Sequence, residues 1–441
     1  MLHHRHTADT VCVIGLGYVG LPLAVALAAR GRRVIGVERN REVGEELRHK
    51  RAHVHEAGLE LAEAVDSGML TVTESLPDGT GVGTYVVCVG TPVDEAGSPD
   101  LSQLEGALAA LAGLVDDGDL IVLRSTVPVG TSRRLLAALR THRDVDLAFC
   151  PERTVQGAAV RELRTLPQIV AGSSPQAVER AAALFRLLTP EIVEVSSLEA
   201  AEIAKLACNS FRYTAFAFAN ELARLCEKVG VSTREVQQAA STGYRRGAMP
   251  APGPAGGSCL PKDIRILSRA FDDYGLGPSG LVDGVGEAHR AVPDRLAVDV
   301  MEHTAKVADF GQLEVALLGV AFKGHPETDD ERCSPSVDLL ERIRRRADAV
   351  TIRSHDPLVP HRRQRALGYL PCAEVAEAVQ GANVVILGTN HRIYRNLSLP
   401  WLTSRMEHPG LVYDIWSLHA DQVPEVPDEV MYLAFGEGQL K

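Results

Sequence analysis

The stretch "VCVIGLGYVGLPLAVALAARG" constrains the fold more than any other part of the sequence. A short apolar run precedes Gly15, Gly17 and Gly20, and a helix-like run follows them. In a strand–turn–helix unit the first glycine permits the tight turn, the second admits a pyrophosphate, and the third allows close packing of helix on strand. The helix N-terminus then offers N–H groups and a positive dipole end. The pattern predicts a dinucleotide site, with a purely structural turn as the alternative.

Glu38 ends the next predicted strand, 23 residues beyond Gly15. A carboxylate there suits the ribose hydroxyls of NAD and repels the 2′-phosphate of NADP. Arg39 lies beside it and weakens that preference. We therefore expect NAD as the cofactor. The other residues that we expect to contact it are Tyr18, Val19, Thr91, Ser125 and Lys262.

Strand-like and helix-like segments alternate in two separate parts of the chain. Between them, Ser197 to about Val229 holds no glycine or proline, so it reads as one long helix that stops at Gly230. Alternating buried strands and helices indicate parallel sheets covered on both faces. The predicted fold class is α/β, with two Rossmann-like doubly wound domains joined by a long central helix. The expected domains are 1–196 (NAD-binding), 197–308 (all-helical) and 309–441 (a second α/β domain).

Charge and cysteine usage exclude several classes of function. The formal net charge is −11 and no long basic run is present, which argues against a nucleic-acid partner. No apolar stretch reaches membrane-spanning length, and the N-terminus lacks the apolar core of a signal peptide. The eight cysteines are dispersed without a CxxC pair, so we expect no metal site and a reducing, cytoplasmic location.

Polar residues follow predicted strands where open α/β sheets bind their ligands. Ser125 and Thr126 follow "LIVL", and Glu152 follows "DLAFC". A helix-capping residue and a surface carboxylate are the ordinary alternatives. Lys205 and Asn209 are four residues apart on the long helix and share one face, where they suit an oxyanion or, alternatively, solvent.

Cys259 lies in the small-residue stretch "AGGSCLPKD". Gly256 and Gly257 are expected to leave its thiol uncrowded. A nearby helix N-terminus and Lys262 would both favour the thiolate, and Asp263 lies just inside that helix. Taken alone, a cysteine is more commonly a buried and inert residue.

Five segments together resemble the UDP-glucose/GDP-mannose dehydrogenase family. They are "GLGYVGLP", "STVPVGT", "KLACNSF", "GGSCLPKD" and "GVAFKGHPETDDERCSP", in the family's order and at its approximate spacings. The resemblance implies NAD-dependent, four-electron oxidation of the C6 alcohol of a UDP-sugar to a carboxylate. It also implies a homodimer or larger homo-oligomer that assembles through the helical domain.

The resemblance also implies roles for particular residues. Cys259 matches the catalytic cysteine, and Glu152 matches the glutamate that assists hydrolysis of the acyl intermediate. The residues that match groups polarising the reacting oxygens or organising water are Lys205, Asn209, Asp263 and Thr126. Substrate contacts are implied for Glu152, Lys205, Asn209, Gly256, Phe322 and Lys323.

Features of two substrate branches are mixed in this sequence. "CPERTVQGAAVRELRTLPQIVAG", "PAPGPAGG" and "YDIWS" resemble the N-acetylhexosamine branch, whereas "GGSCLPKD" resembles the UDP-glucose branch. Gln156 stands where many UDP-glucose enzymes carry a second glutamate. We favour a UDP-N-acetylhexosamine, with UDP-glucose as the alternative. A two-electron hydroxy-acid dehydrogenase and a catalytically silent nucleotide-sugar binder are competitors from other classes.

Overall fold

The computed structural model describes residues 10–76, 81–94, 97–307, 312–347 and 349–438. The N-terminal histidines, for which a solvated tail is expected, lie outside these ranges. The chain forms two compact units. The first unit comprises the residues up to Asn209 together with Arg265–Pro278, and the second comprises Ser210–Ile264 and the residues from Ser279 onward.

The first unit contains an eight-stranded sheet in the order β3-β2-β1-β4-β5-β6-β7-β8. Neighbouring strands are parallel except for β6 and β7, which are antiparallel. The order of the first six strands is that of a Rossmann sheet. The strands are β1 (Thr10–Ile14), β2 (Arg33–Val37), β3 (Leu70–Thr73), β4 (Thr84–Val87), β5 (Leu120–Leu123), β6 (Asp146–Phe149), β7 (Gln168–Gly172) and β8 (Ile192–Glu194).

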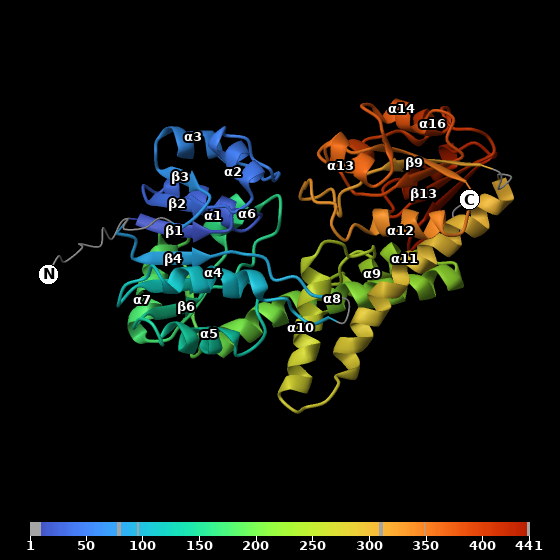
Figure 1. Ribbon diagram of the computed structural model, residues 1–441. Coiled ribbons are helices and arrows are strands. Elements are labelled where there is room, and N and C mark those ends of the chain that lie inside the picture. Colours follow the sequence, from blue (N-terminus) through green and yellow to red (C-terminus); the bar gives the residue numbers. More distant parts are fainter. Residues whose placement is uncertain (1–9, 77–80, 95–96, 308–311, 348, 439–441) are drawn as a thin grey trace. The chain divides into compact units, whose positions relative to one another are not determined.

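Helices cover both faces of this sheet, because its strands are apolar on both sides. One buried cluster joins the strands to α1 (Gly20–Ala28), α2 (Arg41–Arg48), α3 (Leu61–Asp66), α6 (Ala159–Thr165) and α7 (Pro175–Arg186). The cluster on the other face joins them to α4 (Ser102–Ala112), α5 (Thr131–Leu139) and the first residues of α8. Figure 1 shows these two layers around the sheet.

The second unit contains a six-stranded parallel sheet in the order β11-β10-β9-β12-β13-β14. These strands are β9 (Leu313–Leu318), β10 (Val350–His355), β11 (Leu370–Pro371), β12 (Val384–Leu387), β13 (Gly410–Asp414) and β14 (Val430–Ala434). One face packs on α11 (Gly280–Val307) and α12 (Pro335–Arg344). The other packs on α14 (Val375–Val379), α15 (Arg392–Arg395) and α16 (Leu399–Thr403), while α13 (His361–Ala366) follows β10.

The middle of the chain is helical, as predicted. The long helix α8 (Leu198–Val229) is continuous from residues of the first unit into residues of the second. It is followed by α9 (Thr233–Ser241), the short η1 (Arg245–Gly247) and α10 (Cys259–Asp273). The loop between α10 and α11 contains Gly275 and Gly277, which both adopt positive φ.

The predicted fold class is confirmed. The sequence pattern did not predict four strands, all of them at the edges of the two sheets: β3, β8, β11 and β14. Edge strands bury less surface and therefore carry a weaker apolar pattern, as in "LTVT" and "IVE". A further difference from an all-parallel sheet is the antiparallel pairing of β7 with β6.

Candidate active site

The glycine-rich turn follows β1 and leads into α1. Gly15 has φ +87°, and a Cβ there would lie 3.1 Å from the Cys88 carbonyl oxygen. A Cβ on Gly20 would lie 1.8 Å from the Gly15 carbonyl oxygen, so no side chain fits. By contrast, a Cβ on Gly17 would have nothing within 4 Å. Gly15 and Gly20 are therefore required by packing, whereas Gly17 borders open space of the kind that a pyrophosphate needs.

Glu38 directly follows β2 and is tied to this turn. Its Oε2 accepts a hydrogen bond from the Leu16 N–H at 3.2 Å, and its Oε1 accepts one from the Asn40 N–H at 2.9 Å. The carboxylate is half-buried, while Arg39 is exposed and Tyr18 and Val19 are partly exposed beside the turn. This arrangement suits recognition of a ribose diol.

Two hydroxyl groups join the loops that leave β4 and β5. The buried Thr91 side chain donates to the Thr126 carbonyl oxygen at 2.6 Å. The buried Ser125 hydroxyl donates to the Val89 carbonyl oxygen at 2.7 Å. Both hydroxyl protons therefore serve to hold these strand ends together, and Thr126 stays partly exposed at their edge.

Glu152 follows β6 and is 8% exposed. Its Oε2 accepts from Arg124 Nε at 2.9 Å and forms a second contact with Arg124 Nη2. Its Oε1 accepts from the backbone N–H groups of Arg153 at 2.7 Å and Thr154 at 2.6 Å. The carboxylate is thus held from both sides by donors of its own unit.

The charge state of Glu152 follows from these contacts. Burial by itself raises the pKa of a carboxyl group, but the Arg124 charge, the Thr154 hydrogen bonds and the Lys205 charge together lower the pKa of Glu152 below its ordinary value. Lys205 and Asn209 lie one turn apart on α8 and are both nearly buried. The first unit therefore brings Glu152, Arg124 and Lys205 within electrostatic reach of one another.

Cys259 is exposed and is the first residue of the fifteen-residue helix α10. Pro261 lies in the first turn, where a missing N–H is tolerated. Other thiols differ in kind: burial raises the pKa of Cys12 and of Cys150 to about 12. Exposure at a helix N-terminus is the setting in which a cysteine is reactive.

Gly256 and Gly257, which precede the exposed Cys259 in its loop, lie in close contact with other parts of the second unit. A Cβ on Gly256 would lie 2.6 Å from the Pro335 ring, and one on Gly257 would lie 3.0 Å from the Phe322 ring. The Gly257 N–H donates to the Cys333 carbonyl oxygen at 3.2 Å, with Gly257 at φ +84°. These glycines let the loop pack closely against Phe322 and the 328–334 loop, while Cys259 remains exposed.

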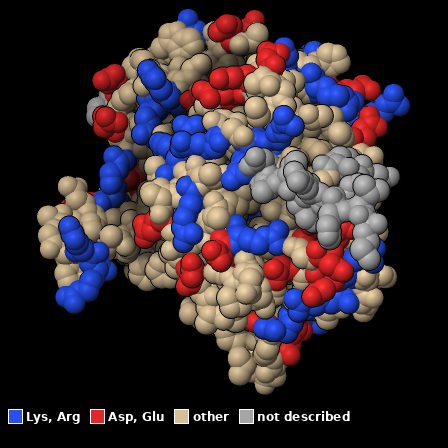
Figure 2. Space-filling view, turned by 90° about the vertical axis from the view of Figure 1, so that its left-hand side faces the viewer, with Lys and Arg blue, Asp and Glu red and all other residues tan. Residues whose placement is uncertain are grey.

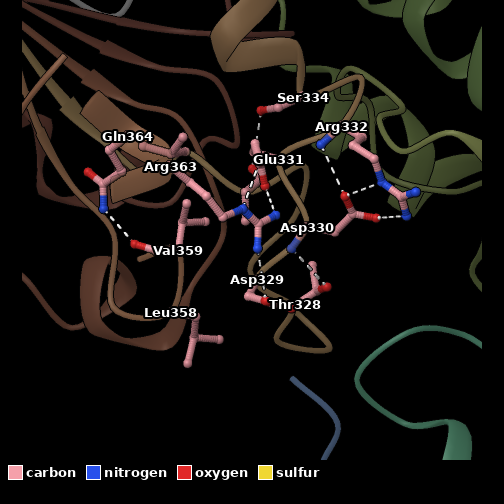
Figure 3. Close-up of polar contacts among 12 residues, drawn as sticks. Thr328, Asp329, Asp330, Glu331, Arg332, Ser334, Leu358, Val359, Arg363 and Gln364 are labelled. Carbon is pink, nitrogen blue, oxygen red and sulfur yellow. Dashed lines mark hydrogen bonds and ion pairs between the residues drawn. The ribbon is translucent and has the colours of Figure 1, made fainter. Parts of the chain in front are cut away.

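An ion-pair cluster holds the 328–334 loop, as Figure 3 shows. Arg363 of α13 reaches Asp329 at 3.1 Å and also pairs with Glu331. Arg332 folds back on Asp330 with two hydrogen bonds of 2.8 and 2.7 Å, while the Asp330 carbonyl accepts from the Phe322 N–H at 2.9 Å. Sequence reasoning missed Arg363, although the acidic run "TDDE" signals a need for a basic partner.

The upstream part of the cysteine loop is clamped by two residues that the sequence analysis did not select. Asn220 of α8 accepts from the Gly253 N–H at 2.8 Å and donates to the Gly253 carbonyl at 3.1 Å. A Cβ on Gly253 would lie 3.2 Å from the Trp416 ring, whose N–H donates to Gly388 at 3.0 Å. A buried side-chain amide paired with one backbone residue in both directions fixes that loop closely.

The remaining predicted site residues also lie in the second unit. Lys262 and the buried Asp263 form an ion pair with 3.1 Å between Nζ and Oδ1. Lys323 Nζ lies 5.6 Å from the centre of the Phe322 ring, a cation–π contact. Lys205 and Asn209 belong to the first unit, whereas Cys259 and Asp263 belong to the second.

The turn after β1, with its packed glycines and the Glu38 carboxylate beside it, defines a dinucleotide-binding α/β protein. Three family models match the chain in order. The NAD binding, central and UDP binding domains of the UDP-glucose/GDP-mannose dehydrogenase family match residues 9–189, 199–288 and 316–421. The chain belongs to the UDP-glucose/GDP-mannose dehydrogenase family, as the sequence motifs predict.

Curated relatives and solved structures agree with this assignment. A UDP-N-acetyl-D-mannosamine dehydrogenase of Pyrococcus horikoshii is 32% identical over 91% of this chain and 94% of its own. A UDP-glucose 6-dehydrogenase of Pseudomonas aeruginosa is 35% identical over 91% of this chain and 92% of its own. A solved structure of the UDP-D-ManNAc dehydrogenase from Pyrococcus horikoshii has a TM-score of 0.86 at 29% identity, covering 98% of this chain and 100% of that one.

The cofactor is NAD, since the NAD binding domain of the family is present and the open space at Gly17 and the Glu38 carboxylate fit a dinucleotide. Among the described residues, no cluster of histidine, cysteine and carboxylate ligands has metal-binding geometry. The described helices include none long and apolar enough to cross a membrane. On the face drawn in Figure 2, basic and acidic side chains are interspersed.

Proposed function

We propose that this protein is an NAD-dependent nucleotide-sugar 6-dehydrogenase. It would oxidise the C6 alcohol of a UDP-sugar to a carboxylate in two two-electron steps, with Cys259 as the nucleophile. The observation that supports this proposal best is the placement of Cys259, exposed at the first position of α10, beside a loop packed on Phe322. A thiol used only for packing would be expected among the buried cysteines of the sheets.

The chemistry assigns each residue a task. The cofactor, which Gly17 and Glu38 would help to hold, would supply a hydride acceptor for each of the two oxidation steps. The Cys259 thiolate adds to the aldehyde carbon and gives a thiohemiacetal, a tetrahedral carbon that has a hydride to lose; an aldehyde by itself does not. Loss of that hydride leaves a thioester, which water cleaves to the carboxylate. Lys205 and Asn209 would stabilise the oxyanion, an effect commonly worth about 3 kcal/mol in comparable sites.

The other predicted residues would support these steps. Asp263 would accept protons, Glu152 would assist thioester hydrolysis, and Thr126 would hold the active-site water. Phe322 and Lys323 would contact the nucleotide, and Gly256 would line the sugar site.

We propose a UDP-N-acetylhexosamine as the substrate, with UDP-glucose as the alternative. The segments "PERTVQG" and "YDIWS" support the N-acetylhexosamine, whereas the segment "GGSCLPKD" supports UDP-glucose. Relatives named for N-acetylmannosamine and for glucose are similar in identity to this chain, at 32% and 35%. The pocket's shape rather than the fold decides such specificity.

A turnover assay with a panel of nucleotide sugars tests the proposal. We expect two NADH per sugar consumed and a uronic acid as product. One NADH per sugar would instead favour the two-electron hydroxy-acid dehydrogenase. Tight binding of a UDP-sugar without formation of any NADH would favour a catalytically silent nucleotide-sugar binder. The same panel identifies the substrate, because UDP-GlcNAc, UDP-ManNAc, UDP-GalNAc and UDP-glucose are compared under one condition.

We also propose a homodimer that forms through α8. The large apolar side chains Phe211, Phe218, Leu225 and Val229 are 76%, 60%, 61% and 65% exposed. They recur at intervals of seven, seven and four residues along the helix, which places them on one stripe that suits a matching helix. Isologous pairing of two such helices is the commonest symmetry among soluble assemblies.

Sedimentation measures this assembly. Replacing Phe218 and Leu225 with aspartate should convert a dimer to a monomer, whereas Arg212→Gln, an exposed change about 100° around the helix from Phe211 and therefore off the stripe, should leave it intact. An unchanged sedimentation coefficient in the aspartate variant would refute the α8 interface.

Because the proposed chemistry needs a reduced thiol, we also propose that the protein works in a reducing cytoplasm.

A further inference from the structure

Arg124 is a buried cation that neither the sequence motifs nor the family assignment explains. It follows β5 and is 2% exposed. A guanidinium so far from water is strongly unfavourable unless all its polar atoms are engaged. The contacts of the Arg124 guanidinium therefore indicate its role.

Each side of the guanidinium has a partner within the first unit. Nε and Nη2 donate to Glu152 Oε2. Nη1 donates to the Cys150 carbonyl at 3.1 Å and to Gln168 Oε1 at 2.9 Å. The Phe185 ring centre lies 5.0 Å from the guanidinium carbon. Gln168 is itself fixed, because its amide donates to the carbonyls of Pro151 and Ile169.

Glu152 is consequently saturated. A carboxylate has about four acceptor positions. Oε1 uses two on the N–H groups of Arg153 and Thr154, and Oε2 uses two on Arg124. A proton on either oxygen would have to displace a donor that has no other described acceptor at that place. The lowered pKa of this buried carboxyl group agrees with the geometry.

We propose that Arg124 is a positioning residue that locks Glu152 as a permanently ionised carboxylate. Glu152 then acts as a fixed negative charge toward Lys205, holding the lysine where the proposed oxyanion forms, and does not itself accept a proton during thioester hydrolysis. This proposal rests on the proposed function and defines the task of one of its residues.

The first test follows the protonation of Glu152 by infrared spectroscopy and needs no substrate. The band of a protonated carboxyl group is titrated in the NAD-bound enzyme and corrected by the same titration of Glu152→Gln. The proposal expects Glu152 to become protonated only below the pH range in which an ordinary glutamic acid does. In Arg124→Met the band should appear at a clearly higher pH. A wild-type band that appears near neutral pH, or a titration that Arg124→Met leaves unshifted, would overturn the proposal.

Arg124→Lys guards against a variant that fails to fold. Lysine keeps the charge but gives up the two-point contact, so the Glu152 titration should move upward by less than in Arg124→Met. The same titration point as in the wild type would overturn the proposal. Arg140→Met is the control, because Arg140 lies in the same unit, is exposed and donates to the Val145 carbonyl. This variant should leave the Glu152 titration unchanged.

Kinetics supply the second readout. Arg124→Lys should lower kcat about tenfold or more at pH 7, while the KM for NAD stays within about twofold. The pH below which kcat declines should also be higher than in the wild type. A kcat profile parallel to that of the wild type would contradict a role through Glu152. If the wild-type protein oxidises no nucleotide sugar, the proposed function fails, and the infrared titration still decides whether Arg124 locks Glu152.

Discussion

The first six strands of the eight-stranded sheet and the six strands of the other sheet follow the same order, but the turns after their central strands β1 and β9 are very different. After β1, Gly15 begins a turn that leads directly into α1, and Glu38 follows β2. After β9, Gly319 occupies the equivalent place, and Asp356 follows β10 in the position of Glu38. Both acids accept N–H groups from the turn beside them, Glu38 from Leu16 and Asp356 from Val320 and Ala321.

The two acids differ in the number of hydrogen-bond acceptor positions that the protein leaves unused. Asp356 is 9% exposed and accepts four backbone N–H groups, two on each oxygen, including those of Leu358 and Val359. In the described part of the chain, each Glu38 oxygen accepts one, so each keeps an acceptor position for a ribose hydroxyl. The second turn is also not followed by a helix until Pro335. One Rossmann sheet can therefore bind a dinucleotide while the other uses its acid as internal structure.

The largest effect that sharpens this comparison is expected from Asp356→Ala. Loss of an acceptor for four N–H groups should lower the free energy of unfolding by about 3 kcal/mol or more, since each stranded donor costs roughly 1–3 kcal/mol. Denaturant unfolding measures this loss, and isothermal titration should give an unchanged NAD affinity. A large loss of NAD affinity in the folded variant would show that the second turn also binds the cofactor.

Acid should act on the second unit through His289. Its ring is stacked on Tyr213 at 3.6 Å and contacts the Tyr213 carbonyl at 2.8 Å, and burial lowers the pKa of His289 to about 4 despite that hydrogen bond. Between pH 6.5 and 4 the unfolded state binds more protons than the folded state. The free energy of unfolding therefore falls as the pH falls through this window, and the contribution of His289 is fully present above pH 6.5.

At pH 5 the loss from this one residue is roughly 2 kcal/mol, taking about 1.4 kcal/mol for each pH unit. Thermal unfolding of the wild type and of His289→Phe, which keeps an aromatic ring against Tyr213, measures it. The variant should show a flatter dependence between pH 6.5 and 4. Identical slopes for the two proteins would contradict the assignment.

Gly17→Ala separates ligand binding from folding at the first turn. Because the added Cβ meets nothing within 4 Å, the melting temperature should hardly change. The methyl group would instead stand where the pyrophosphate approaches, so the dissociation constant for NAD should rise at least tenfold, about 1.4 kcal/mol. An NAD affinity equal to that of the wild type would place the pyrophosphate elsewhere.

Glu38→Gln should have the smallest effect. The amide keeps a hydrogen-bonding group near the ribose but removes the charge that repels a 2′-phosphate. We expect a several-fold weaker affinity for NAD and a several-fold stronger one for NADP, since the exposed Arg39 would favour the phosphate once the neighbouring charge is removed. Competition titrations with the two cofactors measure the ratio; an unchanged ratio would remove Glu38 from ribose recognition.

The sequence predicted the first turn well because its requirements are local. Gly15, Gly17, Gly20 and Glu38 lie within one strand–helix–strand segment, and the geometry of that segment follows from residue type alone. The long α8 was equally predictable, since nothing interrupts its helical pattern over Leu198–Val229.

The surroundings of Cys259 were not predictable in the same way. Its loop is held by Asn220, Phe322, Cys333 and Trp416, which come from distant parts of the chain. Each of these residues has an ordinary local role in the sequence, and only the fold makes it a neighbour of the loop. The same holds for Arg124, whose partner Glu152 lies 28 residues away.

The most direct test of the account is the mass of the enzyme quenched in acid during turnover with its UDP-sugar and NAD. We expect a fraction of the protein to carry the uronyl nucleotide-sugar as a thioester, with the added mass on the peptide that contains Cys259. The adduct should be absent from Cys259→Ser, which should retain NAD binding. Normal oxidation to the uronic acid by Cys259→Ser, or an adduct on another residue, would contradict covalent capture by this thiol.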